Sequence, residues 1–249
     1  MAINNETSTL PIKDIIAQSK LKHIAIIMNG NRRWAKRHFL PSMSGHSAGV
    51  KALKNIINLS SDSGIEYLTV YAFSTENWGR KKEEVDFLML LLGETIKKEL
   101  AELHRNNVKI RIIGYLSSLN IELQNILRHS MEKTSENSGL RLQIAINYGA
   151  RNEIVSAVRQ IATEVQTGKL SAEEINENLI SNYLYTSEIP DPELLIRTGG
   201  EQRLSNYLLW QLAYTEIYVT SILWPDFNKT EFEKAVMEFT KRERRFGKD

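Results

Sequence analysis

The sequence predicts an α/β protein with one mostly parallel central sheet of about six strands, flanked by helices. Short runs of β-branched residues alternate along the chain with longer segments of helical periodicity, which is the pattern of strand–helix–strand units. Most of these runs are almost continuously apolar, as strands buried on both faces should be. The predicted strands are 22–28, 66–73, 108–113, 141–147, 193–197 and 216–220.

Helical patterns occupy the segments between these strands. The predicted helices are 47–62, 82–104, 117–136, 152–167, 171–183 and 229–245. Gly64 is placed to end the first of them as a C′ residue, and Ser171 with Glu174 has the spacing of a capping box. Helix 82–104 has an apolar face wider than one sheet contact requires. This face suits a buried core helix or the wall of a hydrophobic tunnel, and its pattern alone favours the core; it consists of Val85, Leu88, Met89, Leu91, Leu92 and Ile96.

The composition is that of an ordinary globular protein, with 42% hydrophobic and 25% charged residues in 249. Residues 1–20 read as a loose arm or a short helix, and 21–249 as a single domain without repeats or linkers. The net charge of +2 provides no general field for binding nucleic acid.

The absence of cysteine excludes disulfides, thiolate metal sites and cysteine nucleophiles, and fits the cytoplasm. No signal-peptide core and no run approaching about 18 apolar residues are present. We therefore expect a soluble protein without a transmembrane segment, which meets a membrane only through its surface or its substrate.

Ligands of open parallel sheets bind outside the carboxyl ends of the strands, so the segments that follow the predicted strands are the places to look for a site. These segments are 29–33, 74–80, 114–115, 147–151 and 197–205. Three of them contain unusual groups of side chains.

The first group is Asn29-Gly-Asn-Arg-Arg33, with Gly45 and His46 following in the chain. Glycine lets the backbone approach an anion closely, and two arginines can fork onto phosphate oxygens. A surface turn with solvated arginines explains the motif about equally well.

The second group is Phe73-Ser-Thr-Glu-Asn-Trp-Gly-Arg80. An exposed Trp78 is costly unless it meets a ligand or another surface, which favours a mobile loop that covers a substrate. A turn with Trp78 packed in the core is the somewhat better explanation of the motif alone.

The third group is Arg197-Thr-Gly-Gly-Glu-Gln-Arg-Leu-Ser205. Two arginines and a serine around a Gly-Gly turn resemble a second oxyanion cradle, although a tight turn with structural arginines is the alternative. The motif is neither a Walker A loop nor a dinucleotide fingerprint. Two such cradles in one chain favour a site for two phosphorylated groups.

Taken together, the motifs resemble the cis-prenyltransferases, in particular the undecaprenyl diphosphate synthase group. The resemblance runs from about residue 23 to 247 and rests on the order and spacing of five signatures. They are HIAIIMNGNRRWAK with GH at 45–46, YAFSTENWGR at 71–80, INYGAR at 146–151, LLIRTGGEQRLSNYLLWQLAYTEIY at 194–218, and LWPDF at 223–227.

The resemblance implies a homodimer with a hydrophobic tunnel, and a Mg²⁺-dependent transferase. The family condenses isopentenyl diphosphate with an allylic diphosphate, usually farnesyl diphosphate, forming cis double bonds. The product expected from this group is a long-chain polyprenyl diphosphate such as undecaprenyl diphosphate, a precursor of the lipid carrier for cell-wall glycans.

The resemblance also implies roles for individual residues. The expected catalytic residues are Asn29, Ser74 and Asn77, and the expected metal ligands are Asn29 and Glu216. The allylic diphosphate is expected to bind Gly30, Asn31, Arg32, Arg33, Trp34 and His46, and the isopentenyl diphosphate Arg197, Arg203 and Ser205. The mobile loop and its substrate contacts are expected to comprise Phe73, Trp78, Arg80 and Glu84. Arg245-Phe-Gly247, otherwise a solvated helix end, matches an RxG element that lies near the partner subunit's site.

Three positions depart from the family pattern. Asn29 stands where the family has aspartate, and an amide lacks the charge that holds Mg²⁺. Ser42 stands where many members have an arginine for the allylic diphosphate, and Arg37 or Arg32 are the candidates to replace it. Arg32 itself is often glycine in bacterial members, which we interpret as tolerated variation.

Three hypotheses follow. The chain is a cis-prenyltransferase impaired by Asn29, whether engineered or natural, or it is a non-catalytic partner subunit of a heteromeric synthase. The third hypothesis is a family member with altered terpene chemistry. The complete second cradle argues against a scaffold, and the proton acceptor of the condensation remains open between diphosphate oxygen and the Ser74–Asn77 pair.

Overall fold

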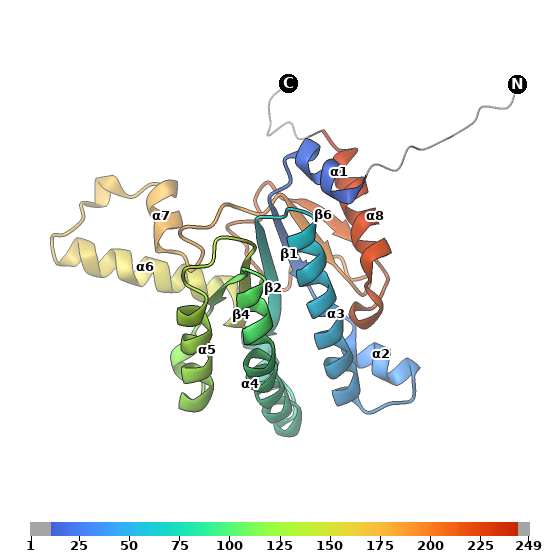
Figure 1. The fold of residues 1–249 in the computed structure, drawn as a ribbon. Helices are drawn as coiled ribbons and strands as arrows, with labels where there is room; N and C mark the ends of the chain where they lie inside the picture. Colours follow the sequence, from blue (N-terminus) through green and yellow to red (C-terminus); the bar gives the residue numbers. More distant parts are fainter. Residues whose placement is uncertain (1–10, 244–249) are drawn as a thin grey trace, which may run out of the picture.

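A six-stranded parallel sheet forms the centre of the molecule in the computed structural model, which describes residues 11–243 (Figure 1). Its strand order is β3-β4-β2-β1-β5-β6, and every neighbouring pair is parallel. The strands are β1 His23–Ile27, β2 Tyr67–Ser74, β3 Lys109–Ile113, β4 Arg141–Tyr148, β5 Leu194–Arg197 and β6 Glu216–Val219. The predicted fold class and all six strands are confirmed.

Eight α-helices flank the sheet within the described residues. They are α1 Ile12–Ser19, α2 Asn31–Arg37, α3 Ser42–Asp62, α4 Lys82–Arg105, α5 Ile121–Lys133, α6 Ala150–Gln166, α7 Glu177–Tyr183 and α8 Lys229–Thr240. Short 3₁₀ helices occur at Thr75–Gly79, Leu116–Ser118, Ala172–Glu174 and Trp224–Asp226. Figure 1 shows α3, α4 and α5 side by side over one face of the sheet, while α6 and α7 project to one side. No helix of residues 11–243 is long and apolar enough to cross a membrane.

The core has two parts because the strands bury both faces. On β1, Ile24 and Ile26 join the larger cluster beneath α3, α4 and α8, whereas Ala25 and Ile27 join a second cluster on the other face. All five residues of β1 are buried, which is the physical origin of its continuous hydrophobicity. The sheet is therefore a rigid platform for the loops at its carboxyl edge.

The helix boundaries agree with the sequence patterns except around short polar elements. Helix α2 lies within a segment that sequence reasoning treated as an anion-binding loop; its Asn-Arg-Arg-Trp-Ala-Lys-Arg run buries only Ala35 and so shows no apolar periodicity. Ser171 and Glu174 form the predicted capping box, but on a 3₁₀ turn that precedes α7. Helix α8 ends at Thr240, and the Arg245–Gly247 element lies outside the described residues.

A buried histidine joins three strands near the amino edge of the sheet. His23 is 2% exposed, its Nδ1 lies 2.6 Å from the Pro190 carbonyl, and its Nε2 lies 2.7 Å from Thr69 Oγ1. Thr69 Oγ1 in turn lies 2.9 Å from Gln143 Oε1 on β4. Burial lowers the pKa of His23 to about 4, so the folded chain holds this imidazole neutral.

Acid should therefore destabilise the fold through His23. A depressed histidine pKa stabilises the native state above the unfolded pKa of 6.5, and this contribution is lost as the pH falls through about 4. The full difference amounts to about 3 kcal/mol. Urea unfolding between pH 7 and 4 should show that loss, and His23→Gln should remove it from the pH dependence. His38→Gln, at an exposed position, is the matched control, and an unchanged slope in His23→Gln would contradict the assignment.

Candidate diphosphate site

Two loops meet at the carboxyl edge of the sheet because β1 and β5 are neighbours, with Ile27 beside Arg197. Thr198 fastens them together: its hydroxyl donates to the Asn29 carbonyl at 2.8 Å and accepts from the Asn29 N–H at 2.9 Å. Gly30 follows with a φ of +114°, where a side chain would collide with Leu223. The first and third sequence groups thus form one structure.

Glu201 connects the two loops a second time, a role that sequence reasoning missed. Its Oε2 accepts from Asn29 Nδ2 at 2.6 Å, and its Oε1 lies 2.8 Å from Arg33 Nη2. Arg33 Nη1 also donates to the Gly199 carbonyl at 2.7 Å. The available signal was a carboxylate directly after Gly-Gly in a cationic loop, although its partners cannot be read from the sequence.

Three adjoining cavities lie beside these loops, and Met28, Asn31 and His46 border all of them. The outer lobe measures about 920 Å³, the inner lobe about 490 Å³ and the apolar lobe about 140 Å³. Asn29 borders the outer and inner lobes. The predicted anion site is therefore the junction of a larger hollow.

The outer lobe is strongly cationic. Its charged lining consists of Arg32, Arg33, Lys36, Arg80, Arg203 and a single carboxylate, Glu201. This excess of positive charge around a concave surface suits a polyanion, and guanidinium groups can bind phosphate oxygens in pairs.

The inner lobe brings together residues from the second and third sequence groups, which are Ser74, Glu76, Asn77, Arg80, Arg197, Arg203 and Ser205. Arg197 is 3% exposed, and its Nη1 donates to the Arg203 carbonyl and to Ser205 Oγ at 3.0 Å. Its buried Nε has no hydrogen-bond partner within residues 11–243. Burial lowers the pKa of Arg197 from its ordinary value. A buried guanidinium with a free donor is suited to an anionic ligand.

His46 lies between the lobes within α3, which begins four residues earlier, at Ser42. Its Nε2 lies 3.3 Å from Glu84 Oε1, and Arg80 Nη1 lies 2.9 Å from the same oxygen. Burial lowers the pKa of His46 despite the carboxylate, so this imidazole is neutral at pH 7. Partial burial works to raise the pKa of Glu84, but Arg80 and Arg32 hold it below its usual range. A neutral His46 can donate one hydrogen bond without adding charge.

The apolar lobe lies between α3 and α4 above β1 and β2. Leu88, Leu91 and Leu92 line it from α4, opposite Val50 and Leu53 of α3. With Ile96, four members of the predicted apolar face of α4 border this cavity, as the tunnel interpretation requires.

The remaining side of α4 faces α5. There Val85 and Met89 line a separate hollow of about 390 Å³ with Leu119, Leu123 and Ile126. The wide apolar face of this helix therefore serves two partners, because it lies between α3 and α5 (Figure 1).

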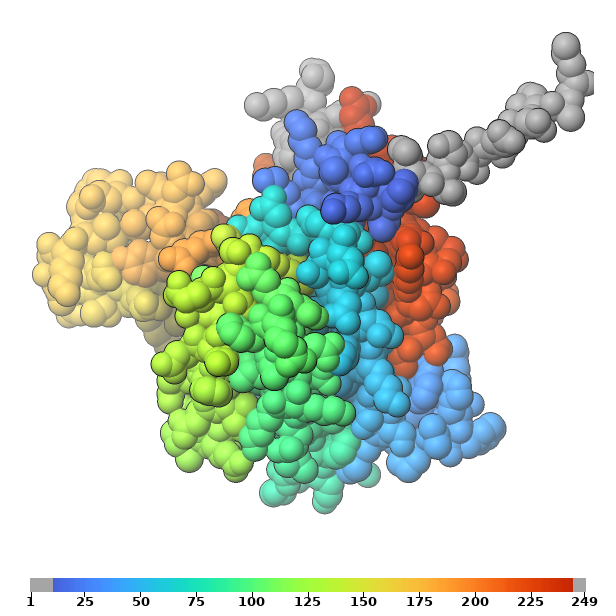
Figure 2. Space-filling model, viewed as in Figure 1, coloured from blue at the N-terminus to red at the C-terminus, as the bar shows by residue number. Residues whose placement is uncertain are grey.

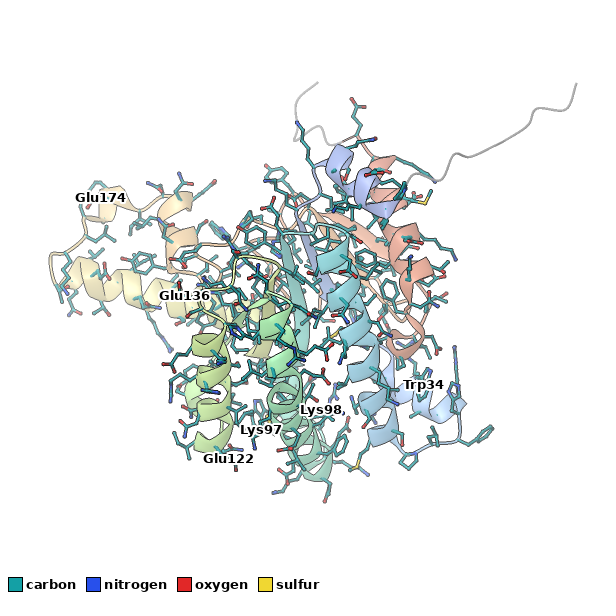
Figure 3. All side chains as sticks on the ribbon, viewed as in Figure 1. Trp34, Lys97, Lys98, Glu122, Glu136 and Glu174 are labelled. Carbon is teal, nitrogen blue, oxygen red and sulfur yellow. The ribbon has the colours of Figure 1, made fainter. Side chains whose placement is uncertain are left out.

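Several predicted site residues lie outside the three lobes. Trp34, labelled on α2 in Figure 3, donates from Nε1 to Asp226 Oδ1 at 2.7 Å. Phe73 is buried against Trp78, whose Nε1 donates to Asn147 Oδ1 at 2.7 Å. Trp78 is 43% exposed, so it is neither packed in the core nor fully open to solvent. The segment that contains it is a 3₁₀ helix held by a Ser74–Asn77 capping box.

Glu216 lies far from Asn29 within one chain. It begins β6, whereas Asn29 follows the end of β1, and all strands of the sheet run in the same direction. The two predicted metal ligands are therefore at opposite edges of the sheet. Glu216 Oε2 accepts from Arg242 Nη1 at 2.9 Å instead.

The residues of a single chain do not fit a Mg²⁺ site. No group of three or more histidine and carboxylate side chains within residues 11–243 could hold a metal ion. Asn29 directs its NH₂ group at Glu201, and that nitrogen is a hydrogen-bond donor that cannot coordinate a cation. Mg²⁺ prefers carboxylate and phosphate oxygen, which Asn29 does not present in this orientation.

The structure distinguishes between the two candidates to replace an arginine at Ser42. Ser42 lines the outer lobe, and Arg32 and Lys36 line it as well, whereas Arg37 does not. Arg32 also acts electrostatically on Glu84 and His46. Arg32 and Lys36 of α2 therefore place positive charge on the cavity that Ser42 borders.

Comparisons with known proteins identify the family of the chain. The family model described as "Putative undecaprenyl diphosphate synthase" matches residues 27–247. The isoprenyl transferase of Clostridium perfringens is 50% identical over 234 residues, covering 94% of this chain and 92% of the relative. That of Bacillus subtilis is 48% identical over 235 residues, covering 94% and 90%.

Two solved structures share the fold. Lavandulyl diphosphate synthase from Lavandula x intermedia, in complex with dimethylallyl diphosphate, gives a TM-score of 0.90 at 38% identity and covers 93% of this chain and 100% of its own. A protein described as a probable undecaprenyl diphosphate synthase from Campylobacter jejuni gives 0.77 at 38% identity, covering 92% and 99%. The chain therefore belongs to the undecaprenyl diphosphate synthase family of cis-prenyltransferases.

Proposed function

We propose that the chain condenses isopentenyl diphosphate with an allylic diphosphate, farnesyl diphosphate being the expected primer, and extends the product with cis double bonds. The observation that carries this proposal is the junction of two cationic lobes with an apolar one. Two diphosphates require two cationic cradles, and a growing hydrocarbon requires a dry wall. Residues 21–249 are proposed as one catalytic domain that acts in the cytoplasm.

The outer lobe is assigned to the allylic diphosphate and the inner lobe to isopentenyl diphosphate. When the allylic C–O bond breaks, negative charge gathers on the departing diphosphate, where Arg33, Arg32 and Arg80 are placed to stabilise it. Arg197 and Ser205 hold the diphosphate of isopentenyl diphosphate, so that the double bond of the isopentenyl group faces the developing allylic cation.

The condensed intermediate then loses a proton. Its acceptor is a diphosphate oxygen or the Ser74–Asn77 pair, in which the Ser74 N–H donates to Asn77 Oδ1 at 3.2 Å. Asn77 Oδ1 already accepts a hydrogen bond from the Ser74 N–H. A further group next to this pair is therefore needed to take up the proton of the intermediate.

Product length separates the proposal from a specific alternative. The apolar lobe measures about 140 Å³, close to the roughly 150 Å³ that holds one benzene-sized group. This small volume, together with the likeness to a lavandulyl diphosphate synthase, favours a short or rearranged product as the second candidate. A long polyprenyl chain, such as a cell-wall lipid carrier precursor, requires α3 and α4 to separate.

Mass spectrometry of the products formed from farnesyl and isopentenyl diphosphates tests both candidates. A ladder of five-carbon increments supports elongation. A single C20 product, or a C10 product when dimethylallyl diphosphate replaces the farnesyl primer, supports the alternative. The absence of any prenyl product, together with stabilisation of an active homologue, would overturn both and favour a non-catalytic partner subunit.

A homodimer is proposed because Glu216 cannot reach Asn29 in its own chain. In a symmetric dimer the edge strand of one protomer can bring Glu216 to the carboxyl edge of the other. Mg²⁺ is proposed to enter with the diphosphates, because this ion usually binds through one or two carboxylates and substrate phosphates.

Mixed dimers test the contribution in trans. Glu216→Gln and Arg197→Met should each abolish most of the prenyl transfer when expressed alone. Co-expressed chains should recover about a quarter of the parental rate, because half of the dimers contain one intact site. Failure to recover activity while mixed dimers form would show that Glu216 acts within its own chain or not at all.

A further inference from the structure

The turn between α2 and α3 presents apolar side chains on a projecting corner of the molecule. Phe39, Leu40 and Met43, which we term the apolar corner, are 98%, 44% and 39% exposed. Figure 1 and Figure 2 show α2 at the lower right of the molecule, beside the start of α3 and below α8.

The backbone at Phe39 is unfavourable for this residue. Helix α2 ends in a Schellman motif, with Phe39 N–H bonded to the Lys36 carbonyl and Leu40 N–H to the Ala35 carbonyl. The C′ residue of this motif adopts left-handed geometry and is usually glycine, yet Phe39 has a φ of 55°. The chain thus holds a strained aromatic residue whose ring gains almost no burial within the fold.

The segment of the chain that contains the corner carries positive charge and no negative charge. The sequence has no Asp or Glu from residue 15 to 61, and this stretch contains eight lysines and arginines. Lys36 and Arg37 are exposed on α2 next to the corner, and neither forms an ion pair within residues 11–243. An apolar tip beside unpaired cations is the arrangement of interfacial segments that bind anionic lipid surfaces.

The outer lobe is open at the same place. Phe39, Leu40 and Pro41 form part of its lining, together with Lys36. A surface that meets the corner therefore also lies at the mouth of the cavity.

We propose that the apolar corner inserts into an anionic membrane surface, with Phe39 and Leu40 among the acyl chains and Lys36 and Arg37 on lipid phosphates. The cavity mouth then faces the bilayer, from which an amphiphilic diphosphate can enter. Only the entry of a diphosphate substrate from the bilayer rests on the proposed function, since binding of the chain to a membrane needs no catalysis.

Flotation of the full chain with lipid vesicles tests the proposal. Vesicles of phosphatidylcholine with phosphatidylglycerol should bind the chain in about 0.1 M salt, whereas vesicles of phosphatidylcholine alone should not. Phe39→Gly should weaken binding about tenfold, because one inserted aromatic side chain is lost. Glycine also relieves the positive φ, so this variant is expected to fold at least as well as the parent.

Two further variants make the result decisive. Arg37→Gln should weaken binding to anionic vesicles about fivefold. Adding 1 M salt should remove most of the binding that this variant retains. Ile121→Ser, at a 67% exposed position on α5, is the matched control and should bind like the parent chain. Prenyl transfer from detergent-dispersed substrate is measured in parallel, so that a failure of the proposed function is recognised separately.

The proposal is overturned if the parent chain does not float with anionic vesicles, or if Phe39→Gly floats as the parent does. Sedimentation analysis of the parent chain and of Phe39→Gly tests whether a second copy of the chain, and not a membrane, covers the corner. Loss of a dimer in Phe39→Gly with unchanged flotation would assign the corner to a second copy of the chain.

Discussion

Asn29→Asp should raise the rate of prenyl transfer with Mg²⁺ by about 10²–10³-fold, which is the effect expected from one preorganised charged group. The substitution replaces the NH₂ donor that faces Glu201 by a carboxylate oxygen, which presents the charge that Mg²⁺ prefers. Steady-state rates at saturating farnesyl and isopentenyl diphosphates measure the gain. An unchanged rate would show that Asn29 does not limit this chain.

The same variant has a signature that does not depend on turnover. With two carboxylates in place of the 2.6 Å hydrogen bond between Asn29 and Glu201, the folded state should lose stability when no cation is present. The melting temperature of Asn29→Asp should therefore lie below that of the parent in EDTA and rise again when Mg²⁺ and diphosphate are added. Asn125→Asp adds the same charge on α5 and should show no such recovery.

Arg197→Met should lower kcat/KM for isopentenyl diphosphate by about 10²–10³-fold, with a much smaller effect on binding of the allylic substrate. Arg197 is buried under the inner lobe, fixes the loop through the Arg203 carbonyl and Ser205, and keeps Nε free for a ligand. Methionine fills part of the same volume but cannot donate to phosphate.

Calorimetric titration with each diphosphate separates loss of binding from loss of fold. The variant should stay folded but melt a few degrees below the parent, because the Arg203 carbonyl and Ser205 Oγ lose a hydrogen-bond donor. Arg159→Met on the exposed surface of α6 is the control and should leave both substrates unaffected. Equal weakening of both substrates would contradict the assignment of Arg197 to one diphosphate.

The sheet was predictable from the sequence because β1 and its neighbours are buried on both faces and carry the signal in every residue. The five segments chosen as ligand positions followed from the same parallel arrangement. Helix α2 escaped prediction since its seven residues bury one alanine, and seven residues are too few to reveal a helical period.

The chemistry of the site was only partly readable. Residue types and spacing identified the arginines, but the partners that orient Arg33 and Asn29 lie about 170 positions away in the sequence. No local pattern reports such a contact. The placement of Glu216 at the opposite edge of the sheet, by contrast, follows from the parallel arrangement, because Glu216 begins a strand and Asn29 follows the end of one.

Arg33 has a consequence for how kinetic data on this chain should be read. Its guanidinium belongs to the first loop but is held by the Gly199 carbonyl and Glu201 of the second. A substitution at Arg33 or Glu201 therefore moves groups on both sides, and an altered KM for one diphosphate is no proof of contact with it. Residues that share partners give non-additive effects, so only double-mutant cycles can divide the binding energy between the two substrates.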